Sequence, residues 1–167
     1  MIFIGLDPGL RITGWGVIRV EGNRLSHIAD GAVSVPASLD LAERLATLHR
    51  ALAELLREFG PDEAAVEETF VNRNPASTLK LGQARGVVMS VPALAGVPVF
   101  EYAANRIKQS LVGSGHAGKN QVEVMVKTLL PGAVIEKADA ADALAVAICH
   151  AHHRQSARRI AAAGGAR

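Results

Sequence analysis

The first sixteen residues, MIFIGLDPGLRITGWG, constrain the possible folds more than any other stretch of the chain. Five of the first six residues are apolar, and the run stops at Pro8-Gly9. A short apolar run that ends at a turn signal predicts a strand buried on both faces of a sheet. Asp7 then lies at the carboxyl end of that strand, where open α/β sheets place ligand-binding residues. On position alone, a catalytic or metal-binding role for Asp7 is about as plausible as capping of the Pro8-Gly9 turn.

The hydrophobic spacing that follows predicts a mixed α/β domain. The first three strands are joined by tight turns and should form an antiparallel meander. We expect Ser38 to cap the first helix, because Ser is a favoured N-cap residue. After the opening strand, we expect strands at 12–20, 25–35, 64–70 and 97–102, and helices at 41–59, 76–91, 103–112, 119–130 and 138 to about 154. This order predicts a mixed five-stranded sheet with helices on both faces.

Length and composition indicate one globular domain. The chain has 167 residues, of which 49% are hydrophobic and 20% charged, so we expect a domain over residues 1–155 and a flexible basic tail at 156–167. The net charge is only +2, but residues 101–167 carry 9 Lys and Arg against 5 Asp and Glu, which suggests one positive face. No signal peptide and no apolar segment long enough for a bilayer are evident, which predicts a cytoplasmic protein without a membrane partner.

Four carboxylates are the strongest chemical signal. Asp7 and Glu67 each end a predicted strand, and these strands can lie side by side and parallel, whereas Glu68 should face the other side of the sheet. Asp139 and Asp142 share one face of the last helix, although acids in a first helical turn also complement the helix dipole. Together the four could hold Mg²⁺, and two ions about 4 Å apart would clamp the attacking water and the leaving oxygen of a phosphodiester. The set therefore predicts phosphodiester hydrolysis.

Four longer motifs carry a resemblance to a known family. They are GLDPGLRITGWGVI from Gly5, VEETFVNRNPASTLKLGQARG from Val66, VFEYAANRIKQSLVG from Val99 and KADAADALAVAICHAH from Lys137. With them, residues 1–155 resemble the RuvC family of bacterial Holliday-junction resolvases, which have an RNase H-like fold. The resemblance implies an endonuclease that nicks two strands of like polarity at symmetric positions in a four-way DNA junction, during recombination and repair.

The resemblance also implies roles for individual residues. Asp7, Glu67, Asp139 and Asp142 match the catalytic carboxylates that bind metal, with two Mg²⁺ ions per site and Mn²⁺ able to substitute. Lys108 and Lys119 match lysines near the scissile phosphate, where they can stabilise developing charge. Phe70 matches an aromatic residue that stacks on opened bases. The candidate phosphate contacts are Arg73, Lys80 and Arg85.

The resemblance further implies a homodimer that works with a branch-migration helicase complex of the RuvA and RuvB type. The dimer interface would use the helix at 76–91, where Gly82 and Gly86 suit a close approach of a neighbouring helix. Alternatively, the two glycines let that helix lie close to its own sheet. Cys149 is expected in the core, and His150, His152 and His153 on the surface or at the carboxyl end of the last helix.

Three other functions match parts of the sequence. An actin-like ATPase would share the opening strand but needs a second Asp-Gly phosphate loop and a much longer chain. An RNase H-like nuclease of another substrate class would share the opening strand as well. A non-catalytic junction-binding scaffold would not need four acids facing phosphates, because they repel DNA unless metal neutralises them.

Overall fold

A single five-stranded sheet forms the centre of the protein. The computed structural model describes residues 1–68 and 75–164, with side chains to residue 161. The strands are β1 (Ile2–Asp7), β2 (Ile12–Glu21), β3 (Arg24–Ser34), β4 (Glu63–Glu68) and β5 (Val99–Ala103). Their order across the sheet is β3-β2-β1-β4-β5, with β1 to β3 antiparallel and β4 and β5 parallel to β1. The predicted meander and the predicted parallel pairing of the strands that carry Asp7 and Glu67 are both confirmed.

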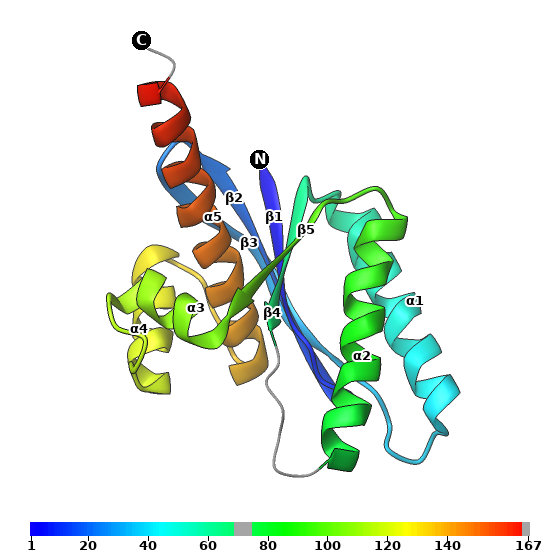
Figure 1. Ribbon diagram of the computed structural model, residues 1–167. Helices are drawn as coiled ribbons and strands as arrows, with labels where there is room; N and C mark the ends of the chain where they lie inside the picture. Colours follow the sequence, from blue (N-terminus) through cyan, green and yellow to red (C-terminus); the bar gives the residue numbers. More distant parts are fainter. Residues whose placement is uncertain (69–74, 165–167) are drawn as a thin grey trace.

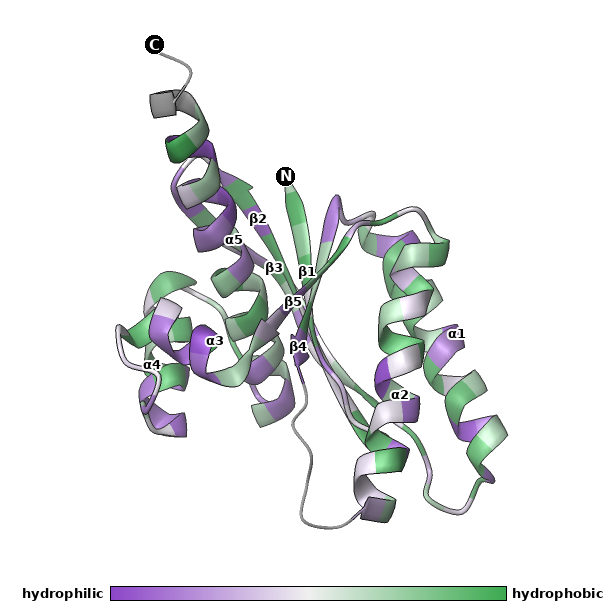
Figure 2. Ribbon diagram, in the orientation of Figure 1, coloured by the Kyte–Doolittle hydropathy of each residue, from purple (hydrophilic) through white to green (hydrophobic). Residues whose placement is uncertain are grey.

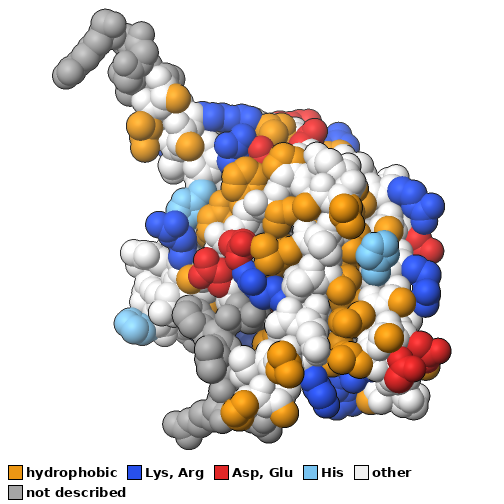
Figure 3. Space-filling view, turned by 45° about the vertical axis from the view of Figure 1, so that its right-hand side comes forward, with side chains coloured by type: hydrophobic (Ala, Val, Ile, Leu, Met, Phe, Trp, Pro, Cys, Tyr) orange, Lys and Arg blue, Asp and Glu red, His pale blue; other side chains and the backbone are white. Residues whose placement is uncertain are grey.

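Helices cover both faces of this sheet, as predicted (Figure 1). One face carries α1 (Leu41–Phe59) and α2 (Pro75–Leu94), and the other carries α3 (Ala104–Val112), α4 (Lys119–Leu129) and α5 (Ala138–Gly164). The sequence of α1 alternates between hydrophobic and hydrophilic residues (Figure 2), and its leucines at 48, 52 and 56 are buried. Viewed from the side of α1 and α2, the surface shows scattered hydrophobic side chains, with Lys and Arg toward its margins (Figure 3).

The amino end of α1 differs from the prediction. Asp40 is the N-cap, and its side chain accepts a hydrogen bond of 2.9 Å from the backbone N–H of Glu43. Ser38 lies too early in the chain, because the N–H of Leu39 already closes a turn onto the carbonyl of Pro36. An Asp directly before the first helical residue accepts from the third N–H of the helix, so it caps better than a Ser further upstream.

The backbone of α5 lies directly on the sheet. A Cβ atom added to Gly5 of β1 would lie 2.1 Å from the carbonyl oxygen of Ala143, and one added to Gly14 of β2 would lie 2.0 Å from that of Asp139. Only glycine permits so close an approach of two backbones. The α5 backbone is therefore held against β1 and β2 at the height of Asp139.

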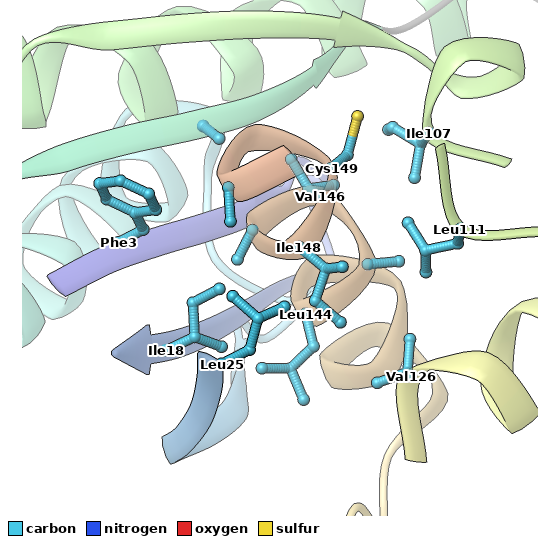
Figure 4. Close-up of a cluster of buried hydrophobic side chains, with 14 of the residues drawn as sticks. Phe3, Ile18, Leu25, Ile107, Leu111, Val126, Leu144, Val146, Ile148 and Cys149 are labelled. Carbon is cyan, nitrogen blue, oxygen red and sulfur yellow. The ribbon is translucent and has the colours of Figure 1, made fainter. Parts of the chain in front are cut away.

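Hydrophobic side chains of α5 fill the space between the sheet and the helices α3 and α4 (Figure 4). Leu144 and Ile148 belong to one buried cluster, as do three side chains of the sheet (Phe3, Ile18 and Leu25) and three of α3 and α4 (Ile107, Leu111 and Val126). Cys149 is fully buried in this cluster, which raises the pKa of its thiol to about 11. Its predicted place in the core is confirmed.

The α5 helix is longer than predicted. It continues to Gly164 instead of ending near residue 154. In the part of the helix after residue 154, Gln155 donates to the carbonyl of Gly22 at 3.0 Å, and Arg159 donates to the side chain of Asn23 at 3.2 Å. Ala, Gln and Arg are good helix formers, so this segment continues the helix without a hydrophobic stripe of its own. The flexibility of residues 156–167 stays a prediction.

His150 lies in the core, contrary to the prediction of a surface position. Its Nε2 lies 2.7 Å from Glu63, its Nδ1 lies 2.8 Å from the hydroxyl of Tyr102, and Arg154 lies 2.8 Å from the other oxygen of Glu63. One neutral tautomer satisfies both ring nitrogens, and burial lowers the pKa of His150. Because α5 is covered on one side by the sheet and on another by α3, a polar residue on this helix can be fully enclosed.

In the parts of the chain that the structure describes, no helix is both long and apolar enough to cross a membrane.

Candidate active site

The register of the sheet places Asp7 beside Glu67. Leu6 of β1 pairs with Val66 of β4 in parallel, so the next residue on each strand is one of these two acids. Adjacent strands lie about 4.8 Å apart, which brings the two carboxylates to one edge of the sheet. Glu67 lines a pocket at this edge, while Glu68 points to the opposite face because neighbouring side chains of a strand alternate.

The start of α5 brings the other two acids to the same edge. Gly14 pairs with Asp7 across β1 and β2, and the carbonyl of Asp139 lies against this same glycine. Asp142 follows three residues later on the same face of the helix and lines the pocket with Glu67. Gly14 carries no chemical group, so sequence reasoning does not single it out. The sequence feature that could have revealed its role is the pair Gly14 and Gly16, two residues apart on one face of β2. Together with an alanine-rich helix, this pair indicates close packing of helix on strand.

Two lysines complete the pocket, which has a volume of about 230 Å³. Lys108 comes from α3, which begins immediately after β5, and Lys119 is the first residue of α4. The ammonium of Lys119 donates to Asp142 Oδ2 at 2.8 Å. Gly118 precedes α4, and its N–H donates to the side chain of Gln121 at 2.9 Å, which orders the turn that presents Lys119. The pocket therefore combines one acid from β4 and one from α5 with two cations, one from α3 and one from α4.

Burial and neighbouring acids raise the pKa values of Asp7 and Glu67. Burial first, and then the charges of Glu67, Asp142 and Asp139, raise the pKa of Asp7 to about 7, while Lys119 opposes the shift. Burial and the charge of Asp142 also raise the pKa of Glu67, against the attraction of Lys108 and Lys119. The hydrogen bond to Asp142 raises the pKa of Lys119. The site holds more negative charge than its own lysines balance, so a further cation would stabilise it.

The donor set fits a divalent metal ion. Carboxylate oxygens are the ligands that Mg²⁺ prefers, and Asp7 with the three acids that act on it outnumbers the two lysines at this edge of the sheet. Within residues 1–68 and 75–164, however, no three acidic, His or Cys side chains are close enough to enclose one metal ion. The acids lie at one edge of the sheet but do not surround a common point. The ammonium of Lys119 contacts the carboxylate of Asp142 at a position where a metal could bind.

The candidate DNA-binding residues lie elsewhere. Arg85 forms an ion pair with Glu101, and Lys80 lines a separate pocket beside the amino end of α2. Phe70 and Arg73 lie outside the described residues. The structure thus brings the predicted acids and Lys108 and Lys119 together at one edge, and places the other two described candidates apart from them.

Comparison with known proteins identifies the family. A family model described as crossover junction endodeoxyribonuclease RuvC matches residues 3–150. The chain is 64% identical over 163 residues to the protein of that name from Paramagnetospirillum magneticum, covering 98% of each chain. It is 62% identical over 169 residues to the one from Rhodospirillum rubrum, covering 100% of each.

Solved structures agree with these sequence matches. The structure of Thermus thermophilus RuvC matches with a TM-score of 0.86 and 35% identity, covering 94% of this chain and 97% of that one. The same protein in complex with a Holliday junction substrate matches with a TM-score of 0.88 and 34% identity, over 94% and 96% of the chains. The predicted RNase H-like fold is confirmed by these two matches. Taken with the arrangement of acids at the edge of the sheet, these matches show that the chain belongs to the RuvC family of crossover junction endodeoxyribonucleases.

Proposed function

We propose that this endonuclease resolves four-way DNA junctions by metal-dependent nicking at the pocket between β1, β4 and α5. The observation that carries the proposal is the meeting of Asp7, Glu67 and the α5 acids at one edge of the sheet, where burial, followed by the charges of the other three acids, raises the pKa of Asp7 to about 7. A cluster that disfavours its own negative charge is suited to bind divalent cations. Divalent metal dependence is a general property of nucleases of this family.

The proposed reaction is hydrolysis of a phosphodiester bond that leaves ligatable ends, as the family resemblance implies. Water attacks the phosphorus and the bond to the 3′ oxygen breaks, which leaves a 3′-hydroxyl and a 5′-phosphate that a ligase can rejoin. Mg²⁺, with two ions per site and Mn²⁺ as a substitute, would polarise the phosphoryl oxygens and acidify the attacking water. Asp7 and Glu67 hold their carboxylates on rigid strand ends, and Asp139 and Asp142 approach from the α5 helix.

The lysines act on the phosphate itself. Lys108 and Lys119 line the pocket that contains Glu67 and Asp142, so a phosphate bound there lies within reach of both ammonium groups. Positive charge at this place stabilises the negative charge that develops on the phosphoryl oxygens. The ion pair between Lys119 and Asp142 must then break, so that Lys119 can contact the phosphate and Asp142 can bind the metal ion.

A homodimer matches the symmetry of the substrate. A four-way junction has approximate two-fold symmetry, and a C2 dimer presents two equal sites for paired nicks on strands of like polarity. The exposed side of α2 supports this interface, because a Cβ added to Gly82 or Gly86 would meet no atom of the described residues within 4 Å. The alternative that these glycines let α2 lie close to its own sheet is therefore wrong. Leu79 on the same helix is 66% exposed, which leaves apolar surface for a partner.

The remaining assignments come from the family resemblance. Phe70 would stack on bases opened at the junction centre, and Arg73, Lys80 and Arg85 would contact phosphates. A branch-migration complex of the RuvA and RuvB type would deliver the junction, and work on chromosomal DNA implies a cytoplasmic location. The Thermus thermophilus relative has been solved with a Holliday junction substrate, which supports junction DNA as the substrate here.

The adjacent pair Glu67 and Glu68 allows a sharp test. Glu67→Gln and Glu68→Gln remove the same charge one residue apart, on opposite faces of β4. Each variant and the wild type are incubated with a synthetic four-way junction and with a linear duplex of the same sequence, in Mg²⁺ or in EDTA. We expect paired symmetric nicks on the junction alone, in Mg²⁺ alone, with Glu67→Gln inactive and Glu68→Gln active.

Three other outcomes would contradict parts of the proposal. Junction binding by the wild type without nicks in Mg²⁺ would identify a binding scaffold. Cleavage of duplex or RNA in preference to the junction would assign another nuclease class. Loss of activity in Glu68→Gln with activity kept in Glu67→Gln would exchange the roles of the two acids.

A further inference from the structure

A second pocket, of about 430 Å³, lies at the same end of the molecule as the acidic pocket but on the side of α1 and α2. The amino ends of both helices and the carboxyl end of β1 converge there (Figure 1). Its lining comes from three regions of the chain, namely the β1–β2 loop, the approach to α1 with its first turn, and the first two turns of α2. The lining residues are Leu10, Arg11, Ala37, Arg44, Ser77, Lys80 and Leu81.

The described side chains that line this pocket carry a net positive charge. Arg11, Arg44 and Lys80 are its charged lining residues, and none of the described residues that line it is an acid. In the described residues no ion pair joins any of these three cations to a carboxylate, whereas Lys119 and Arg85 each have an acidic partner. Three cations that approach one another without counter-charge repel each other, and an anion between them would reverse this effect.

Arg44 is already held in place for such an anion. Its Nη2 donates to the carbonyl of Leu10 at 3.1 Å, which ties the first turn of α1 to the β1–β2 loop. Its Nε is buried, and within the described part of the chain no group accepts a hydrogen bond from it. A buried donor without an acceptor is unfavourable, and an anion bound in the pocket could supply that acceptor.

The amino end of α2 adds to the positive potential. Helix amino ends carry about half a positive elementary charge, and α2 has no acidic residue in its first turn. The amino end of α1 contributes less, because Asp40 and Glu43 offset it. The attraction for an anion therefore comes from the three cations and from α2.

We propose that Arg11, Arg44 and Lys80 form a second phosphate site that holds the DNA backbone of a junction arm next to the strand being cut. The proposal rests on the junction-nicking function proposed above. Arg11 follows Asp7 by four residues, so their Cα atoms are at most about 14 Å apart. One turn of duplex is about 34 Å long, so this distance is less than half a turn, and DNA bound at the acidic pocket can reach Arg11 without bending away. DNA that crosses this edge of the sheet would touch both pockets.

A matched pair of arginine variants tests this proposal. Arg11 and Arg19 are both exposed, but Arg19 pairs with Ile2 at the other end of the sheet. Junction binding by Arg11→Gln, Arg19→Gln and Arg11→Gln/Lys80→Gln is measured by fluorescence anisotropy in EDTA over a range of salt concentrations. Each lost phosphate contact should make the plot of log affinity against log salt shallower by about 0.9, so the double variant should lose about 1.8. Arg19→Gln should match the wild type. Arg44 is left unchanged because it also supports the Leu10 carbonyl.

Two results would overturn the second site. Equal salt slopes for Arg11→Gln and Arg19→Gln, with wild-type junction binding and nicking intact, would refute the second site and leave the proposed function standing. Saturable binding of inorganic phosphate that is lost in Arg11→Gln, without any change in the junction slope, would assign the pocket to a small anion instead of DNA. Failure of the wild type to bind or nick the junction would refute the proposed function itself.

Discussion

Replacing Asp7 with Asn should stabilise the metal-free protein at neutral and alkaline pH. The raised pKa of Asp7, from an ordinary value of 3.8 to about 7, measures how strongly the folded site resists its negative charge. Burial is the largest cause, followed by repulsion from Glu67, Asp142 and Asp139. Asn has nearly the same shape and carries no charge, so the variant removes both causes and keeps the packing.

The size of the effect follows from linkage between proton binding and folding. A shift of about 3 pKa units corresponds to about 4 kcal/mol, and water that reaches the pocket reduces this to about 2–4 kcal/mol. Below pH 3.8 Asp7 is protonated in both the folded and the unfolded chain, and it contributes no difference. Between 3.8 and about 7 the folded state holds the proton more tightly, so wild-type stability falls as the pH rises and the loss is complete above about 7. Asp7→Asn does not suffer this loss.

The assay is thermal unfolding of wild type and Asp7→Asn in EDTA at several pH values between about 4 and 8. For a chain of this length, the expected gain at the alkaline end is roughly 5–15 °C in Tm, falling toward zero at the acidic end. Excess Mg²⁺ should raise the Tm of the wild type, because it binds only the folded site, and should raise that of Asp7→Asn less. Glu68→Gln controls for the loss of one negative charge at the same edge of the sheet.

Two results would refute the reasoning about Asp7. One is a lower Tm for Asp7→Asn than for wild type at the alkaline end in EDTA, which would make the carboxylate a stabilising partner in the fold. The other is a difference in Tm that does not vary with pH, which would mean that the pKa of Asp7 is not raised.

Three further changes have definite expected outcomes. Lys119→Met should bind Mg²⁺ up to about fivefold more tightly in calorimetry, because no ammonium then contacts the carboxylate of Asp142. The rate of nicking should fall by about 10² or more, because the phosphate loses a positive charge beside it. Unchanged metal affinity would contradict this. Gly14→Ala should cost about 1–3 kcal/mol in urea unfolding and reduce nicking, because its Cβ would lie 2.0 Å from the carbonyl oxygen of Asp139; an unchanged midpoint would contradict the close contact. His150→Phe should lower the free energy of unfolding in urea by about 1–3 kcal/mol, because the Tyr102 hydroxyl and one oxygen of Glu63 each lose a buried hydrogen-bond partner. Wild-type stability would contradict the buried network.

Sequence patterns were sufficient for the parts of the fold that depend on neighbours in the chain. Apolar runs, turn residues and helix-start signals together predicted the five strands and five helices of the described chain, with most boundaries within one or two residues. The acids could be assigned to one site because strand ends and a helix face are local features. Asp7 is the last residue of β1, Glu67 is the last but one of β4, and Asp139 and Asp142 are three residues apart.

Features that depend on contacts between distant segments could not be predicted from the sequence pattern. His150 was expected on the surface because a helical pattern does not reveal that α5 is covered by both the sheet and α3. Arg11, Arg44 and Lys80 are separated by more than thirty residues from one another and meet only because the loop after β1 and the amino ends of two helices converge.

Local patterning therefore determines the elements, their order and the chemical groups that this protein carries into its site. The tertiary structure decides how those groups act. It places the carbonyl of Asp139 against Gly14, so that the α5 acids lie at the end of β1. It also buries Asp7 among three other carboxylates, which raises its pKa to about 7. Burial and charge repulsion depend on the distances between segments far apart in the chain, and only packing sets those distances.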